Sequence, residues 1–259
     1  MLSVVSPAKA LDFETAVATA KESEPRMLDR SAELAAIMAG KSEDEVRSLM
    51  GLSAKLGALN ADRFQAWRRD HSNGESRQAV LAFDGDTYHG LDAPASFSER
   101  DYTHAQKTLR ILSGLYGVLR PLDTIQPYRL EMGTKLATPK GDDLYAFWGS
   151  EITTTLQSDL DASPGAAVIV NLASKEYFSA VKQDQLAARV ITPKFLDSKG
   201  GAPPKVVSFF AKRARGAMAG WMVRERITTA RAIAEFDGLG YRHDPDASGG
   251  DAPTFVRYA

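Results

Sequence analysis

The amino-acid sequence predicts an α/β fold, with one domain over residues 1–259 built on a single mixed sheet surrounded by helices. Three observations predict it. Apolar residues recur at helical spacing through residues 14–70, the segment AAVIVNLAS holds three β-branched residues in a row, and helix-like and strand-like segments alternate without a fixed repeat. Such alternation is typical of a sheet with helices packed around it.

The first half of the chain predicts four elements. MLSVVS is a short apolar strand closed by Pro7, and residues 14–70 are helical. RQAVLAFDGDTYHGL, residues 77–91, predicts a strand that ends in an Asp-Gly turn. DYTHAQKTLRILSG predicts a helix from about Asp101 to Gly114, because glycine suits the C-terminal cap.

The second half predicts a helix over residues 142–160, with acids in its first turn, and then the buried strand AAVIVNLAS. The helix KEYFSAVKQ follows. RVITPKFL, PKVVSFF and PTFVRYA predict further strands, and residues 211–236 predict one or two helices. Residues 244–250 are the one segment that the sequence predicts to be loose.

Composition excludes several function classes. The 259 residues are 44% hydrophobic and include no cysteine, which rules out disulfides, thiolate metal sites and a peroxidatic thiol. The four histidines stand in no metal-ligand spacing and no glycine-rich phosphate loop is present, so we expect neither a metal nor a cofactor. The N-terminus lacks a signal-peptide pattern and no apolar run is long enough to span a bilayer, which predicts a cytoplasmic protein without membrane contact.

Charge is unevenly distributed although the net charge is only −1. Residues 205–231 hold seven basic residues and one acid, a balance of +6, whereas residues 141–163 hold five acids and no base. Two interpretations remain open: a positive surface for an anionic partner, or ion pairs between segments. The basic segment predicts an amphipathic helix that exposes Lys212 and Arg215 and buries four apolar residues, Phe210, Ala214, Ala217 and Trp221.

Three short segments are candidates for a site. SPAK, residues 6–9, has the Ser-x-x-Lys spacing, but its companion motifs are missing and Ser6 as a cap is the simpler interpretation. NLASKEYF follows a buried strand, where ligands settle in open α/β sheets, and offers donors, a cation and a carboxylate from Asn171, Ser174, Lys175 and Glu176. The alternative there is ordinary helix capping by Ser174.

The third segment, SGLYGVLRPLDTIQPYRLEMGTKL, combines glycines with cations on irregular backbone. Gly114 and Gly117 could present backbone N–H groups to an anion, and the Arg fork of Arg120 or Arg129 suits phosphate or carboxylate. The alternative is that these arginines pair with Asp123, Glu131 or the acidic segment 141–163.

These motifs, together with MLSVVSPAKALDF and ARGAMAGWMVRERI, resemble the YaaA family, bacterial proteins linked to hydrogen-peroxide resistance. The resemblance covers nearly the whole chain. It implies a family-specific α/β fold with a helix-hairpin-helix-like element, a positively charged cleft that binds duplex DNA, and a role in limiting the damage that peroxide causes with free iron. The hairpin would lie at residues 114–117, although Tyr116 adds one residue to the usual pattern and Pro121 limits a second helix.

Two function classes therefore compete. The first is a protein that binds duplex DNA without reading its sequence; the second is an enzyme that acts on a nucleotide or other small anionic substrate in the same cleft, with Lys9 or Lys175 as acid or base. No catalytic residue is assigned and no oligomeric state follows from the sequence. The residues expected to bind DNA or another anion are Lys9, Gly114, Gly117, Arg120, Arg129, Lys135, Asn171, Ser174, Lys175, Lys212 and Arg213.

Overall fold

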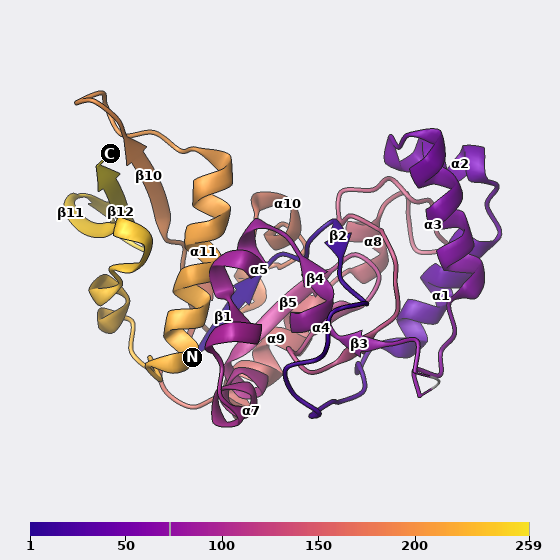
Figure 1. Cartoon of the computed structure of the whole chain (residues 1–259), viewed down its shortest axis with the longest axis horizontal. Helices are drawn as coiled ribbons and strands as arrows, with labels where there is room; N and C mark the ends of the chain where they lie inside the picture. Colours follow the sequence, from indigo (N-terminus) through magenta and orange to yellow (C-terminus); the bar gives the residue numbers. More distant parts are fainter. Residues whose placement is uncertain (73, 259) are drawn as a thin grey trace.

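A five-stranded sheet forms the centre of the protein. The structure, a computed structural model, describes residues 1–72 and 74–258. The strand order is β6-β5-β1-β8-β9, in which β1 pairs in parallel with β5 and β8, β8 pairs in parallel with β9, and β6 runs antiparallel to β5 (Figure 1). The predicted mixed sheet is confirmed, with strands β1 (Leu2–Val5), β5 (Leu109–Ser113), β6 (Gly117–Leu119), β8 (Val168–Asn171) and β9 (Arg189–Ile191).

The three middle strands are buried along their whole length. Every residue of β1, β5 and β8 is buried, which is expected of parallel strands with both faces covered. β1 and β8 were predicted from their apolar runs. Because they are parallel, β1 and β8 end at the same edge of the sheet, at Val5 and Asn171. The loops that leave these two ends therefore start side by side.

The helix predicted for residues 101–114 is only partly right. Helix α7 (Glu99–Thr108) has a capping box formed by Ser98 and Asp101, and it ends six residues before Gly114. The residues that follow are β5, whose Leu109 pairs with Ser3 of β1. Pairing with the sheet overrides the local helical pattern, because it buries Leu109, Ile111 and Leu112 completely.

The acidic segment forms two helices instead of the one predicted. Helix α8 (Leu144–Trp148) ends at Gly149, whose φ of +52° is left-handed, and α9 (Glu151–Ala162) begins two residues later. Helices α7 and α11 (Ser208–Arg224) contact β1, and α9 contacts β6. One hydrophobic cluster includes residues from Met1 to Phe255. Among the described helices, none has the length and hydrophobicity needed to cross a bilayer.

Two further units lie at opposite ends of the long axis in Figure 1. One contains α1 (Leu28–Ala39), α2 (Glu43–Met50) and α3 (Ala54–Ala66), so the predicted helical region begins at 28 and not at 14. The other is the sheet β10-β12-β11, formed by β10 (Lys194–Ser198), β12 (Ala252–Tyr258) and β11 (Arg242–Gly249). Residues 244–249, predicted to be loose, thus belong to an edge strand with an irregular register. The last residue of the predicted strand PTFVRYA, 259, lies outside the described residues.

Residues 77–91 are not one strand, and this prediction was wrong. They form β3 (Arg77–Gln78), α4 (Ala79–Ala82), β4 (Phe83–Asp84) and α5 (Asp86–Leu91). The short strands pair elsewhere, β3 with β7 (Thr124–Ile125) and β4 with β2 (Ala10–Leu11). The remaining short elements are α6 (Ala93–Ser96), α10 (Lys175–Phe178) and the 3₁₀ helices η1 (Gln183–Gln185), η2 (Arg231–Glu235) and η3 (Gly238–Gly240).

The basic segment forms the predicted helix, α11, with three corrections. Ala214 is buried and Lys212 is exposed, as expected, whereas Ala217 and Trp221 are half-buried and not buried. Phe210 is 38% exposed, and its ring packs against the Arg257 guanidinium, which lies 4.1 Å from the ring centre. Arg215 is half-buried and not exposed. The segment PKVVSFF, predicted as a strand, contributes only a bridge at Lys205 before α11 begins.

Glycines let α5 and α11 approach at backbone distance. A Cβ atom at Gly216 would lie 1.7 Å from the Thr87 carbonyl oxygen, and one at Gly90 would lie 1.9 Å from the Arg213 carbonyl oxygen. A side chain at either position therefore requires the two helices to separate. This crossing sets the distance between Thr87 on α5 and the cations of α11.

We expect Gly216→Ala to lower the free energy of unfolding by about 1–3 kcal/mol, the usual cost of overpacking. Thermal unfolding should show a loss of several degrees in Tm. Gly249→Ala is the matched control, since no atom lies within 4 Å of its added methyl group. Equal melting temperatures for the two variants would contradict the close helix contact.

Candidate functional site

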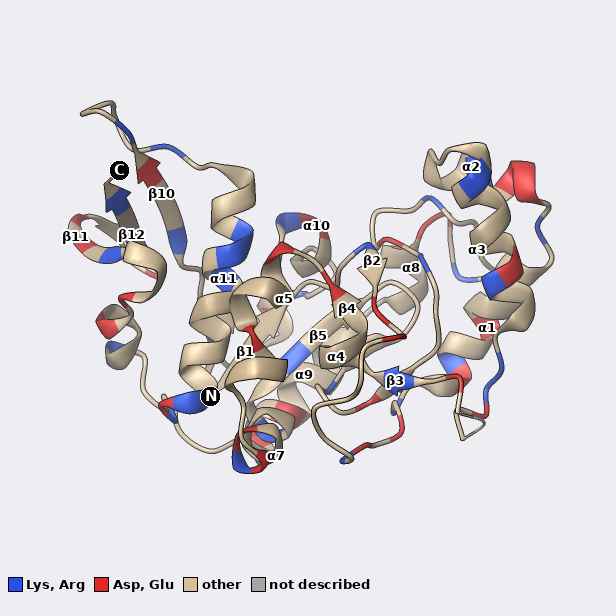
Figure 2. Cartoon of the chain, in the orientation of Figure 1, with Lys and Arg blue, Asp and Glu red and all other residues tan. Residues whose placement is uncertain are grey.

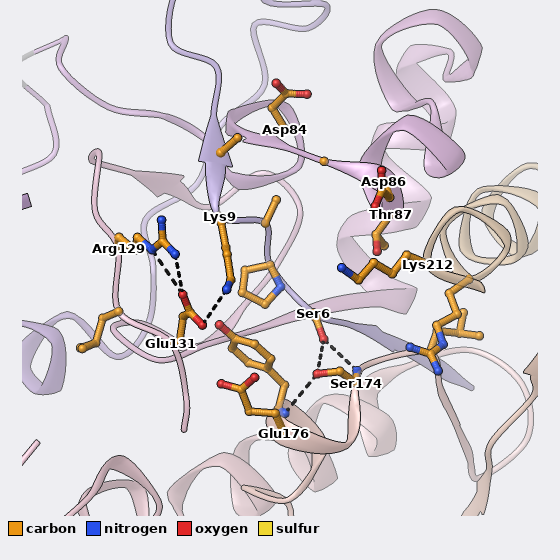
Figure 3. A pocket seen from close by; sticks show the side chains of 18 of the residues that line it. Ser6, Lys9, Asp84, Asp86, Thr87, Arg129, Glu131, Ser174, Glu176 and Lys212 are labelled. Atoms are coloured by element: carbon orange, nitrogen blue, oxygen red, sulfur yellow. Dashed lines mark hydrogen bonds and ion pairs between the residues drawn. The ribbon is translucent and has the colours of Figure 1, made fainter. Parts of the chain in front are cut away.

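A cavity of about 440 Å³ opens at the edge of the sheet where β1 and β8 end (Figure 3). Its walls come from the loop after β1, the turn between β4 and α5, residues 128–131, the loop and helix after β8, and α11. In open α/β sheets, the crevice outside the carboxyl ends of the strands is where ligands bind. The cavity is within the range of about 300–1,000 Å³ typical of small-molecule sites.

Two serines join the loops that leave β1 and β8. Ser6 Oγ accepts a hydrogen bond from the Ser174 backbone N at 2.8 Å, and the two hydroxyl oxygens are 3.3 Å apart. Ser174 also caps α10, since its side chain accepts from Tyr177 N. The predicted capping role of Ser174 is confirmed, and both hydroxyls border the cavity (Figure 3).

A second wall carries an ion-pair network centred on Glu131. Lys9 Nζ lies 3.1 Å from Glu131 Oε2, and Arg129 Nη2 lies 3.0 Å from Glu131 Oε1. Figure 3 shows the three side chains converging on one side of the cavity. Lys9 is therefore neutralised by a carboxylate, and among the described contacts Ser6 and Lys9 share no hydrogen bond. The Ser-x-x-Lys spacing does not form a nucleophile–base pair here.

The opposite wall carries two cations of α11 with no carboxylate partner. Lys212 is exposed and points from α11 toward the two serines (Figure 3), and Arg215, one helical turn later, is half-buried. Within the described part of the chain, neither side chain makes an ion pair. Desolvation by burial lowers the pKa of Arg215.

Acidic groups line the cavity as well. Its lining includes four cations (Lys9, Arg129, Lys212, Arg215) and four carboxylates (Asp84, Asp86, Glu131, Glu176), so its formal charge is zero. Asp84 accepts from the His89 ring at 2.6 Å, and Glu176 Oε1 accepts from Gly133 N at 2.9 Å. The lining is thus mixed in sign. Lys175 at the start of α10 and Arg213 on α11 are exposed cations that adjoin lining residues in the sequence but do not line the cavity.

Four of the eleven residues predicted for the site line the cavity: Lys9, Arg129, Ser174 and Lys212. Lys175 and Arg213 are adjacent in the sequence to residues that line the cavity. Lys135 is adjacent to Thr134, which lines a smaller neighbouring cavity together with Glu131 and Glu176. Asn171 is buried and shapes the loop instead, because its Oδ1 accepts from Ala173 N at 3.0 Å.

Arg120 has a structural role. Its guanidinium lies 2.8 Å from Asp123 Oδ1, and its Nη2 also donates to the Glu24 carbonyl oxygen. The alternative interpretation of this stretch, arginines paired with nearby acids, is therefore the correct one for both Arg120 and Arg129. The acidic segment contributes too, since Asp159 of α9 binds Arg110 of β5.

The glycine segment 114–117 is a turn between two strands. Ser113 of β5 pairs with Gly117 of β6, so the expected helix-hairpin-helix-like element is not shown at these residues. Both glycines are buried. Gly117 has the expected positive φ, +67°, whereas Gly114 does not; a Cβ atom at Gly114 would lie 2.3 Å from the Leu130 carbonyl oxygen, so close packing requires glycine there. Neither glycine faces the cavity.

Sequence reasoning missed Asp86 and Thr87 of the cavity. Both follow the Asp-Gly pair that was interpreted as a simple turn, and this pair was the available signal, because it comes directly after β4. Glu176 was noted in NLASKEYF as a carboxylate of a possible cleft but was not included among the expected binding residues, and it lines the cavity. In the described residues, no group of three or more His, Asp or Glu side chains is placed to hold a metal ion.

Comparison with known proteins agrees with the resemblance in the motifs. Residues 1–247 match the family described as "Peroxide stress protein YaaA". A relative from Laribacter hongkongensis, described as a UPF0246 protein, is 53% identical over 258 residues, and the match covers 99% of both chains.

Proposed function

We propose that this protein, whose chain belongs to the peroxide stress protein YaaA family, acts in the hydrogen-peroxide response by binding duplex DNA without sequence preference. One observation carries the proposal. Four exposed cations line the cavity or directly adjoin, in the sequence, residues that line it or its smaller neighbour, and within the described residues none of them has a carboxylate partner. We call them the rim cations: Lys135, Lys175, Lys212 and Arg213.

Unpaired cations suit the phosphate backbone. A paired cation must first give up its carboxylate, whereas an exposed lysine or arginine can neutralise a phosphate directly and release its counterions. Figure 2 shows basic segments on α11 and on α10. Phosphate contacts fix position but carry no sequence information, so this arrangement favours non-specific binding.

The same contacts would limit iron damage. Fe²⁺ is attracted to DNA phosphates like any other cation, and peroxide reacts with it there to form damaging radicals. A protein that neutralises phosphates displaces condensed cations, including Fe²⁺, from the stretch that it covers. No thiol chemistry is needed, which agrees with a chain that has no cysteine.

We expect the double variant Lys175→Gln, Arg213→Gln to bind a 30-base-pair duplex more weakly than the wild type. Each lost phosphate contact should reduce the slope of log affinity against log salt concentration by about 0.9. Fluorescence anisotropy across a salt series measures both quantities. The matched control is Lys55→Gln, Arg100→Gln, which removes two exposed, unpaired cations from α3 and α7.

Two outcomes would overturn the proposal: wild-type binding that does not change with salt, or equal slopes for the rim variant and the control. A plasmid-nicking assay with Fe²⁺ and peroxide extends the test to function. Wild-type protein should protect the plasmid, and the rim variant should protect it less at the same protein concentration. Neither rim substitution touches a residue that lines the cavity.

A further inference from the structure

The cavity interior has a feature that DNA binding at the rim does not use. Arg215 lies half-buried in the wall, and no carboxylate among the described residues neutralises it. Burying a charge without a partner is costly, and proteins usually pair such a group or expose it. The two arginines that are fully buried both have partners: Arg110 is held by a carboxylate, and Arg77 donates to backbone carbonyl oxygens.

The two lining cations that have no carboxylate partner stand on one side of the cavity. On the far side, Lys9 and Arg129 both pair with Glu131. On the α11 side, Lys212 and Arg215 are one helical turn apart and both line the cavity, so they can approach a single bound group together. Ser6 and Ser174 line the same cavity, and in Figure 3 the Lys212 side chain points toward them.

We propose that this cavity binds a small metabolite through an oxyanionic group, a phosphate or a carboxylate, held between Lys212 and Arg215. The arginine supplies paired N–H donors in a fixed fork, and the lysine supplies a point charge. The Ser174 hydroxyl, which accepts from Ser6 Oγ and donates to no described residue, can donate to the same group. The cavity volume of about 440 Å³ leaves room for a body larger than the anion itself.

The α5 wall of the cavity favours hydrogen-bond donors on the ligand. Asp86, at the start of α5, is half-buried, and its carboxylate makes no hydrogen bond or ion pair with another described residue. Figure 3 shows Asp86 and Thr87 on the same side of the cavity as Lys212. A carboxylate accepts but does not donate, so it selects hydroxyl, amino or ammonium groups. The ligand class is therefore a small molecule that carries hydrogen-bond donors close to its oxyanion.

Isothermal titration of the full-length protein with inorganic phosphate and, separately, with succinate tests the proposal. Sodium chloride keeps the ionic strength constant, and no DNA is present, so the result does not depend on DNA binding. We expect saturable binding of at least one probe, with an affinity at least tenfold lower in Arg215→Gln. Binding of phosphate alone indicates a phosphoryl ligand, and binding of succinate alone a carboxylate ligand.

Two further variants complete the design. Lys212→Gln, at an exposed position, keeps the test valid if Arg215→Gln does not fold, and it should also weaken binding. Arg100→Gln removes an exposed cation of α7, outside the cavity, and should bind the probe like the wild type. The proposal is overturned if neither probe binds saturably at millimolar concentrations, or if Arg215→Gln and Lys212→Gln both bind like the wild type.

Discussion

The Asp159→Ala variant is expected to lose about 3–5 kcal/mol of unfolding free energy, because it leaves a buried arginine without its counterion. Asp159 Oδ2 lies 2.6 Å from Arg110 Nε, and both side chains are almost fully buried between α9 and β5. The second oxygen, Oδ1, accepts from Arg26 at the same distance. Ala in place of Asp removes the carboxylate that Arg110 and Arg26 share.

Urea unfolding of the variant beside Asp161→Ala measures this effect. Asp161 is on the same helix, is exposed, and has one surface hydrogen bond, from Gln157. Its removal should change stability by no more than about 0.5 kcal/mol, as is usual for surface positions. Similar losses for the two variants would show that the buried pair contributes little.

The same carboxylate predicts a dependence on pH. Desolvation raises the pKa of Asp159, but hydrogen bonds from Arg26 and Arg110 outweigh it and lower the pKa below its usual value. A carboxyl group whose pKa is lower in the folded state than in the unfolded state stabilises the protein at pH values above its unfolded pKa of about 3.9. This stabilisation is lost as the pH falls through the folded pKa. The difference in unfolding free energy between the wild type and Asp159→Ala should therefore be smaller at pH 3 than at neutral pH.

Elements that are determined locally could be predicted from the sequence. β1 and β8 are short apolar runs with β-branched residues, and α7 starts at a capping box. Residues adjacent in the sequence are therefore enough to predict these two strands and the start of this helix. The end of α7 could not be predicted, since Leu109–Ser113 becomes a strand only when β1 is beside it. The strand predicted for residues 77–91 was wrong for the same reason, because β3 and β4 pair with strands far away in the chain.

The site was predictable only in part. Ser174 and Lys9 follow buried strands directly, so their place at the sheet edge follows from the order of elements. Arg215 and Asp86 line the same cavity because α5 and α11 cross at Gly90 and Gly216, a contact between segments more than 100 residues apart. Ion pairs between segments were one of the two interpretations of the uneven charge, but no local sequence pattern predicts that Arg26 pairs with Asp159.

The Gly117→Val variant should lose stability while leaving the DNA-binding surface unchanged. Gly117 has a φ of +67°, which costs a β-branched residue about 1–3 kcal/mol. A Cβ there would also lie 2.7 Å from Met27 Sδ and 2.9 Å from a Trp148 ring atom, so overpacking adds a cost of about 1–3 kcal/mol. The glycine is needed for the turn and for the packing around it.

A control variant separates these two costs. Gly51→Val has nearly the same φ, +61°, but no atom within 4 Å of its Cβ, so it reports strain without overpacking. Urea unfolding should therefore rank Gly117→Val below Gly51→Val, and both below the wild type. In anisotropy titrations, the folded fraction of Gly117→Val should bind duplex DNA like the wild type, because both glycines of the hairpin are buried and neither lines the cavity. A variant with wild-type stability that no longer binds DNA would instead place the 114–117 hairpin in the DNA interface.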